Sequence, residues 1–311
     1  MKYSIVFPGQ GSQSPGMLSD LRSNFSVINE IFQEASDAIN VDLWRIINED
    51  QESLNLTENT QPAMLAAGYA TYKVLASEVS LTPISIAGHS LGEYTALVTS
   101  GSLSFFDAVQ LVRKRAELMQ AAVPSGSGSM AAILGLDDQK VIEICSIANA
   151  VGVVEAVNFN SPGQVVIAGE KKAVVNACEL MKEAGAKRAL VLPVSVPSHC
   201  SLMKDAAMDF KHSVDNINFQ MGSEKVLHNV DADYSSNIKE IKSKLVEQLH
   251  KPVLWTSIVQ EMKSSGVEKL IEAGPGKVLA GLTRRIDKSL SGSAIIDVTT
   301  LKSTIEEISN A

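Results

Sequence analysis

The chain has 311 residues, of which 45% are hydrophobic and 5% aromatic, and its formal net charge is −8. This size and apolar share suffice for a sizeable core, and they predict one large domain carrying a smaller one. The negative charge argues against a nucleic-acid partner, because proteins that bind nucleic acids present basic surfaces to the phosphates. The sequence shows neither a charged, hydrophobic, cleavable leader nor an apolar run of about 18 residues, so we expect no membrane partner and a cytoplasmic location.

The chain opens with a short apolar run, residues 1–7, and continues into a glycine-bearing loop that reaches Met17. The run predicts a buried strand. A loop of this kind can bring a backbone N–H close to a developing oxyanion, and Gln10 is the residue expected to supply it. The loop has no Gly-x-Gly-x-x-Gly continuation and no Gly-Lys-Ser/Thr, so nucleotide binding has little support.

Residues 84–101 combine a strand-like apolar run, a Gly-x-Ser-x-Gly turn centred on Ser90 and a helix-like stretch. This order is typical of a nucleophile elbow, in which Gly88 and Gly92 permit a sharp turn that lifts the serine hydroxyl clear of the sheet. The start of the following helix favours negative charge, so the Leu91 N–H is predicted to act with that of Gln10 on an oxyanion. An ordinary strand-to-helix turn is the alternative, but the flanking pattern favours the catalytic interpretation.

Residues 104–123 predict a helix of about five turns, because Ser104 and Asp107 have near capping-box spacing at its start. At about 100° per residue, Arg115 lies at the centre of the apolar stripe. The stripe consists of Ala108, Leu111, Val112, Leu118, Met119 and Ala122. A guanidinium that faces a core must be paired. Two partners remain open: an internal Asp or Glu, or a substrate carboxylate held by two parallel N–H···O bonds.

The middle of the chain predicts the order βαββαβ after a Pro-Gly-Ser hinge at 124–129, and this order is that of the ferredoxin-like plan. The predicted elements are strand 130–134, helix 137–148, strands 153–158 and 164–168, helix 171–184 and strand 187–192.

The flanking segments alternate strands and helices, as in a mostly parallel α/β sheet. We therefore expect a hydrolase-like large domain, residues 1–125 and 194–311, with an inserted ferredoxin-like small domain, residues 126–193. The active site is expected in the cleft between the two domains.

A serine nucleophile needs a base within hydrogen-bond reach, usually a histidine. Of the five histidines, His199 is the predicted base, because a proline-held extended segment runs into a new helix there and presents the ring at an element end. His89 adjoins the serine, and its side chain is expected to point away from Ser90 and to shape the turn. The remaining histidines are interpreted as surface, cap or core residues: His212, His228 and His250.

The group that orients the histidine stays open at this point. Hydrolases with this elbow place the acid between the serine and the histidine. Here the acids that could serve mostly follow His199, and the downstream aspartates are Asp205, Asp209, Asp231 and Asp233.

The cysteines, Cys145, Cys178 and Cys200, have neither metal-ligand nor Cys-x-x-Cys spacing, so disulfide and zinc interpretations are weak. Cys200 adjoins His199 and is the alternative nucleophile, but only Ser90 has the elbow.

With these residues assembled, the chain resembles the malonyl-CoA:acyl carrier protein transacylases of fatty-acid synthesis, which are related to the acyltransferase domains of polyketide synthases. The resemblance spans nearly the whole chain in order. The matching segments are Phe7–Gln13, Thr60–Ala63, Gly88–Glu93, Arg115, Asn158–Gln164, Val196–His199, Asn229–Val230, Gln248 and Glu272–Gly276. Ala273 stands where the family often has Ile or Leu, and we interpret it as a packing change.

The resemblance implies that Ser90 is acylated, that His199 is the base, and that Arg115 holds the free malonyl carboxylate. Gln10 and Leu91 match the oxyanion-hole residues of the family.

The resemblance also implies that the histidine is oriented by a main-chain carbonyl at the position of Gln248 instead of an aspartate. Asn160 and Ser198 lie in matching segments and are expected at the substrate pocket. The expected enzyme is an acyltransferase that works through a Ser90 malonyl ester, with malonyl-CoA and coenzyme A as substrate and product, a transient acyl carrier protein partner, and no bound cofactor or metal.

Two other functions remain open. A serine hydrolase would use the same elbow without a thiol acceptor, and Arg115 would then need an internal acid. A catalytically silent carrier-binding protein would keep the fold without forming an acyl group. Docking of an acidic carrier needs a local basic patch, and the candidate residues are Lys171, Lys172, Lys182, Lys187 and Arg188.

Overall fold

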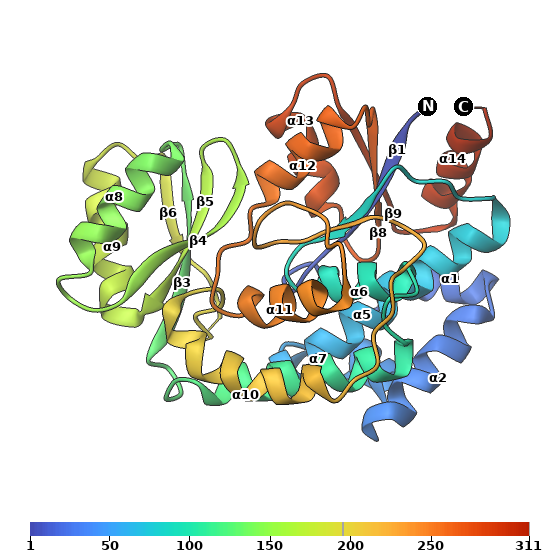
Figure 1. Cartoon of the computed structure of the whole chain (residues 1–311), viewed down its shortest axis with the longest axis horizontal. Helices are drawn as coiled ribbons and strands as arrows, with labels where there is room; N and C mark the ends of the chain where they lie inside the picture. Colours follow the sequence, from blue (N-terminus) through green and yellow to red (C-terminus); the bar gives the residue numbers. More distant parts are fainter. Residues whose placement is uncertain (195, 311) are drawn as a thin grey trace.

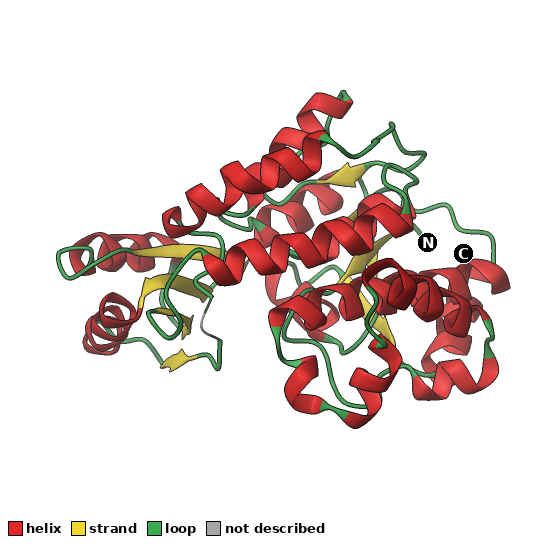
Figure 2. Ribbon diagram, turned by 90° about the horizontal axis from the view of Figure 1, so that it is seen from below, coloured by secondary structure: helices red, strands yellow, loops and turns green. Residues whose placement is uncertain are grey.

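Two separate β-sheets organise the chain in a computed structural model that describes residues 1–194 and 196–310 (Figure 1). Ser195, in the segment ahead of His199, and Ala311 lie outside the described residues. The four-stranded sheet with its helices α8 (Asp138–Ala148) and α9 (Lys171–Glu183) lies at one end of the molecule, and the five-stranded sheet lies toward the other. The N- and C-termini lie close together in both ribbon views (Figure 2).

The five-stranded sheet has the order β7-β2-β1-β8-β9, and every neighbouring pair is parallel. This confirms the predicted parallel α/β architecture. Its strands are β1 (Tyr3–Phe7), β2 (Ile86–Gly88), β7 (Val226–Leu227), β8 (Lys269–Ala273) and β9 (Ser291–Ile295).

Alternation along β1 shows how this sheet is covered. Ile5 and Phe7 join one large core, whereas Val6 joins a second, separate core. Because successive side chains of a strand point to opposite faces, the sheet is buried on both sides. Every residue of β1 is therefore buried, as the opening run predicts.

The helices outside the four-stranded sheet supply these covering layers. They are α1 (Ser19–Asn24), α2 (Val27–Ile39), α3 (Leu43–Glu49), α4 (Gln51–Leu54), α5 (Thr57–Glu78), α6 (Gly92–Thr99), α7 (Phe105–Ala121), η1 (Ser201–Met203), α10 (Lys204–Asp215), α11 (Ile238–Gln248), α12 (Trp255–Ser264), α13 (Val278–Ile286) and α14 (Val298–Ser309). None of the helices in the described part of the chain is long and apolar enough to cross a membrane.

The four-stranded sheet has the order β4-β5-β3-β6, and every pair is antiparallel. With α8 after β3 and α9 after β5, this is the predicted βαββαβ plan. Its strands are β3 (Gly128–Leu134), β4 (Val154–Ser161), β5 (Gln164–Glu170) and β6 (Arg188–Val191). The boundaries proposed for an inserted domain, 126–193, stay a prediction.

One face of the small sheet packs on α8 and α9, and the other face reaches toward the rest of the molecule. Ala131 and Ile133 share a core with the two helices, whereas Met130 and Ala168 share a smaller core with Cys200. The C-terminal half of β4 also hydrogen-bonds to the part of the chain that follows the small sheet, because Phe159 N donates to Val253 O at 3.0 Å. The segment that carries His199 therefore lies where the two sheets meet.

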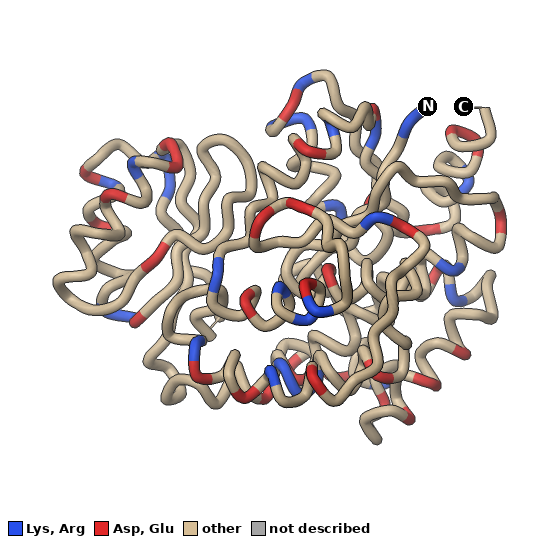
Figure 3. The backbone as a smooth tube through the Cα atoms, in the orientation of Figure 1, with Lys and Arg blue, Asp and Glu red and all other residues tan. Residues whose placement is uncertain are grey.

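Charged residues of both signs are interleaved over both parts of the molecule (Figure 3). The five cations suggested for carrier docking are exposed on α9 and at β6. Their role in docking stays a prediction.

Candidate active site

The elbow forms because two glycines let β2 and α6 approach closely. A Cβ on Gly88 would lie 1.9 Å from the Gly92 carbonyl, and one on Gly92 would lie 2.1 Å from Phe7 O. Between them Ser90 adopts φ 51°, in the left-handed region that side chains other than glycine rarely occupy. The predicted strand, sharp turn and helix are therefore all present, and Ser90 lies at their junction.

Ser90 and His199 come together from distant parts of the sequence. Ser90 Oγ lies 2.7 Å from His199 Nε2, and His199 Nδ1 lies 2.6 Å from the main-chain oxygen of Gln248. A carbonyl oxygen can only accept, so Nδ1 carries the proton and Nε2 offers its lone pair to the serine hydroxyl. This is the tautomer a general base needs.

His199 has a strained backbone conformation, and a backbone hydrogen bond and burial hold it in this position. Its φ is 67°, its N–H donates to Leu249 O at 3.0 Å, and it is 2% exposed. Burial, with a further contribution from the charge of Arg115, lowers the pKa of His199 to about 3. The imidazole is therefore neutral near neutral pH and can accept a proton.

The partner of His199 Nδ1 is a main-chain carbonyl, the kind of group that the resemblance implies for orienting the ring. Among the residues that the structure describes, no carboxylate hydrogen-bonds the His199 ring, whose two nitrogens face Ser90 and Gln248. The open alternative of a Ser-His-Asp arrangement with one of the four downstream aspartates therefore has no geometric support.

Arg115 lies on the buried side of α7, as predicted, and is 2% exposed. Its Nη1 donates to Gln61 Oε1 at 2.7 Å, and its Nη2 donates to Gln248 Oε1 at 3.1 Å and to Ser90 Oγ at 3.2 Å. Within the described chain no Asp or Glu oxygen accepts a hydrogen bond from this guanidinium, and Nε is without a partner. Among the described residues Arg115 therefore has no internal salt bridge, one of the two partners left open.

The surroundings remove Arg115 from water and, within the described chain, give it hydrogen-bond partners that are neutral. Burial lowers the pKa of Arg115, while nearby Tyr94 and Glu93 oppose that change. The guanidinium carbon also lies 5.5 Å from the centre of the Tyr94 ring. A buried cation that has only neutral oxygen partners beside the nucleophile is suited to bind an incoming carboxylate.

The loop that carries Gln10 lies directly on the elbow. His89 N donates to Phe7 O at 3.0 Å, and a Cβ on Gly9 would lie 2.5 Å from His89 O. This contact brings the Gln10 backbone to the elbow, and Leu91 is the residue immediately before α6. Both predicted oxyanion donors therefore belong to the backbone around Ser90, and their role stays a proposal.

The remaining histidines behave as interpreted. His89 Nε2 lies 2.8 Å from Asn160 Oδ1, so its ring is engaged with β4. His228 is a satisfied core histidine, 1% exposed, with Nδ1 2.7 Å from Glu93 Oε1 and Nε2 2.8 Å from Ser235 Oγ. His212 and His250 lie in the last turn of α10 and after α11.

The two residues expected at the substrate pocket lie close to these groups in the chain. Asn160 is partly buried in β4 and hydrogen-bonds His89, and Ser198 is partly buried next to His199. Their contact with substrate stays a prediction.

Cys200 is a poor alternative nucleophile. It is fully buried, its Sγ donates to Pro197 O at 3.1 Å, and burial raises the pKa of its thiol to about 12. The reactive thiolate is therefore scarce near neutral pH. No group of three or more His, Cys, Asp or Glu among residues 1–194 and 196–310 is arranged to hold a metal ion.

Sequence reasoning gave no role to three buried polar residues that complete the site: Gln61, Glu93 and Asn229. Asn229 Oδ1 accepts from Ser90 N at 2.6 Å, and its Nδ2 donates to Gly88 O at 2.7 Å, so it ties the elbow together. The sequence contained a signal for these roles, because each of the three is a polar residue in a segment whose other residues predict burial.

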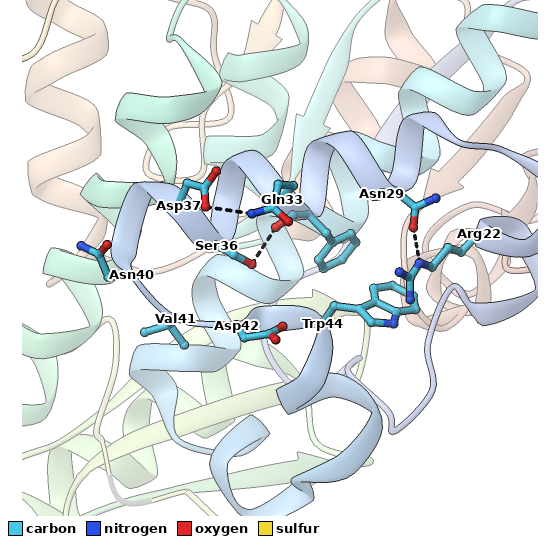
Figure 4. Close-up of a pocket in the computed structure, with 10 residues that line it drawn as sticks. Arg22, Asn29, Gln33, Ser36, Asp37, Asn40, Val41, Asp42 and Trp44 are labelled. Atoms are coloured by element: carbon cyan, nitrogen blue, oxygen red, sulfur yellow. Dashed lines mark hydrogen bonds between the residues drawn. The ribbon is translucent and has the colours of Figure 1, made fainter.

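A cavity of about 330 Å³ lies elsewhere, between α1, α2 and α3 (Figure 4). It is lined by residues from Arg22 to Trp44, and the Arg22 guanidinium lies over the Trp44 ring at 4.0 Å. None of the candidate site residues borders this cavity, so the cavity is separate from the candidate active site.

Comparisons with known proteins find relatives over nearly the whole chain. Residues 4–302 match the family described as the acyl transferase domain. A malonyl CoA-acyl carrier protein transacylase from Haemophilus influenzae is 52% identical over 96% of this chain and 96% of its own. An acyl carrier protein S-malonyltransferase from Vibrio cholerae superposes with a TM-score of 0.95 at 50% identity, over 98% of this chain and 100% of its own.

A further solved structure holds a type II PKS acyl-carrier protein in complex with its malonyl-transacylase. It superposes with a TM-score of 0.97 at 47% identity and covers 99% of this chain and 100% of its own.

Proposed function

We propose, from the premise that this chain belongs to the malonyl CoA-acyl carrier protein transacylases of the acyl transferase family, that it moves a malonyl group from coenzyme A to the phosphopantetheine thiol of acyl carrier protein. The enzyme is an acyltransferase, and acyl carrier protein is its transient partner.

One observation at the site carries the choice of acyl group. The Arg115 guanidinium is buried, its hydrogen-bond acceptors among the described residues are all uncharged, and its Nη2 lies 3.2 Å from Ser90 Oγ. A malonyl group bound to the serine would place its free carboxylate within reach of this cation, which would then gain the charged partner that a buried guanidinium requires. A simple ester hydrolase has no use for such a cation.

In the first half-reaction, Ser90 Oγ attacks the thioester carbonyl carbon while His199 Nε2 takes the hydroxyl proton. The carbonyl oxygen becomes an oxyanion that the Gln10 and Leu91 N–H groups stabilise. When the intermediate collapses, the C–S bond breaks, and His199 returns the proton to the departing sulfur of coenzyme A. Ser90 then carries the malonyl group as an oxygen ester.

In the second half-reaction, the phosphopantetheine thiol loses its proton to His199 and attacks the ester carbonyl. The C–O bond to Ser90 breaks, and Ser90 Oγ takes the proton back from His199. Malonate leaves as a thioester of the carrier protein, and the enzyme returns to its starting state.

These steps use only the side chains and backbone groups of the chain, so the proposed chemistry needs no resident cofactor. The absence of a bound cofactor and a cytoplasmic location stay predictions.

Intact-protein mass spectrometry tests the proposal directly. Wild type and Ser90→Ala are mixed briefly with malonyl-CoA, and holo acyl carrier protein is added afterwards. We expect a malonyl adduct on wild type only, followed by transfer of the same mass to the carrier. An adduct that disappears equally fast without carrier would indicate a hydrolase, and the lack of any adduct would contradict the proposal.

A further inference from the structure

Glu93 is a fully buried acidic residue next to the elbow, and the mechanism above gives it no role. It lies in the first turn of α6, three residues after Ser90. Its Oε1 lies 2.7 Å from His228 Nδ1, and its Oε2 accepts from Asn229 N at 3.1 Å and from Gln248 Nε2 at 2.7 Å. Both carboxylate oxygens are therefore engaged inside the protein.

Gln248 connects this carboxylate to the reacting groups. Its Nε2 donates to Glu93 Oε2 and, at 2.9 Å, to Ser90 O, while its Oε1 accepts from Arg115 Nη2 at 3.1 Å. The main-chain oxygen of Gln248 meets the His199 ring. One residue thus contacts Arg115 with its side chain and His199 with its backbone.

The Gln248 amide can adopt only one orientation in this setting. A flipped amide would point its NH₂ at the Arg115 guanidinium and its oxygen at the Glu93 carboxylate, which would set donor against donor and acceptor against acceptor. Buried groups left in that state cost far more than a hydrogen bond gains. Glu93 therefore selects the rotamer that presents Gln248 Oε1 to Arg115.

We propose that Glu93 is a positioning residue for acyl-group selectivity: through the Gln248 amide it aims the Arg115 guanidinium at the carboxylate of an acyl group on Ser90. The inference rests on the proposed function and deepens it. Glu93 touches neither substrate nor the reacting atoms, and its effect passes through Gln248.

The test is a double-mutant cycle that uses Glu93→Met and Gln248→Met. Both changes remove the polar contacts while nearly preserving side-chain length, and Gln248→Met leaves the main-chain carbonyl for His199. The measured quantity is the ratio of kcat/KM for malonyl-CoA to kcat/KM for acetyl-CoA. We expect each single variant to lower the ratio about tenfold, mainly through KM for malonyl-CoA, and the double variant to lower it no further.

Glu93→Gln is the conservative control. Its amide oxygen can still accept from Gln248 Nε2, and its NH₂ can face His228 if that ring donates from Nε2 to Ser235 instead. We expect this variant to restore the ratio to within about threefold of wild type. If Glu93→Met does not fold, as thermal melting would reveal, Glu93→Asp replaces it in the cycle, because the shorter side chain withdraws the carboxylate from Gln248.

Losses that add in the double variant would overturn the inference, because they would show that Glu93 does not act through Gln248. An equal loss of malonyl and acetyl transfer in the Glu93 variant used in the cycle, Glu93→Met or Glu93→Asp, would also overturn it, because that result indicates a role in stability alone. Failure of the proposed function would give a different experimental result. In that case wild type itself forms no malonyl ester on Ser90, whatever residue stands at position 93.

Discussion

At the residue scale, Arg115 is the residue that we propose selects the acyl group. A charged side chain that is 2% exposed and has only amide and hydroxyl oxygens as partners is incompletely compensated. That state is costly in the free protein, and it is relieved when a carboxylate arrives. The proposed selectivity would thus arise from an unfavourable feature of the free enzyme.

Arg115→Ala is expected to lower kcat/KM for malonyl transfer about a hundredfold or more, because it removes a buried, charge-assisted hydrogen-bonding partner. Acetyl transfer should fall at most a few-fold, since an acetyl group has no charge to match. Parallel assays with malonyl-CoA and acetyl-CoA check this. Equal losses for both substrates would show that Arg115 serves the fold instead of the acyl group.

His199 is the second residue whose environment makes a measurable prediction. Burial and the charge of Arg115 lower its pKa to about 3 from a usual 6.5. The base is active when neutral, that is above its pKa, so a lowered pKa extends activity toward acid.

We therefore expect kcat/KM to stay level from about pH 8 down to about pH 5. The assay should use a malonyl thioester without phosphate groups, so that no ionisation of coenzyme A enters the profile. An acid limb with its midpoint near the ordinary histidine value would contradict the prediction.

At the element scale, the elbow depends on backbone contacts that only glycine permits. A Cβ at Gly88 would overlap the carbonyl of Gly92 and lie 2.4 Å from Glu93 N. These are backbone atoms, which cannot move aside as the end of a flexible side chain can.

Gly88→Ala is expected to destabilise the protein by about 3 kcal/mol or more and to abolish acylation of Ser90. Gly281→Ala is the matched control, because Gly281 lies inside α13 with nothing within 4 Å of an added Cβ. That change should be neutral or stabilise by up to ~1 kcal/mol. Chemical denaturation of both variants checks the pair, and similar losses in the two would refute the steric argument.

A second element-scale feature links α5 to α7. Pro62 lies inside α5 and has no N–H for the carbonyl of Glu58, and that carbonyl accepts instead from Arg113 Nη1 at 3.1 Å. The contact compensates the interrupted helix turn that carries Gln61, the partner of Arg115. The cation of the site and its amide partner are thus held by neighbouring turns of two packed helices.

At the scale of the whole molecule, Glu272 couples stability to pH. It is fully buried in β8, its Oε2 accepts from Ala280 N at 2.8 Å, and within the described residues its Oε1 has no partner. Burial raises the pKa of Glu272 to about 7 from 4.5. The folded protein therefore holds this proton more tightly than the unfolded chain does.

Because the folded-state pKa is raised, the stabilising contribution is complete below about pH 4.5 and is lost as pH rises toward and through 7. The difference amounts to at most ~3 kcal/mol. Glu272→Gln removes the titration, so the free energy of unfolding of wild type should fall relative to the variant as pH rises through this window. Denaturant melts from about pH 5 to about pH 8 check this, and parallel curves for the two proteins would refute it.

Much of the fold was predictable from local pattern. The period-two and period-3.6 patterns and the turn residues predicted βαββαβ for the middle of the chain, and the structure has that order with ends shifted by at most three residues. The elbow was predictable because Gly-x-Ser-x-Gly between a strand and a helix has one common backbone solution. The burial of Arg115 followed from its position on the apolar stripe of α7.

The sequence by itself therefore determined the helices and strands, the elbow with Ser90 at its centre, and the burial of Arg115. Each of these depends on neighbours within a few turns of the chain. The amide partners of Arg115 and the links from Glu93 through Gln248 were decided only by the tertiary structure. Those contacts join residues 54 to 155 positions apart, and such pairings are set by how helices and sheets pack, which no local pattern encodes.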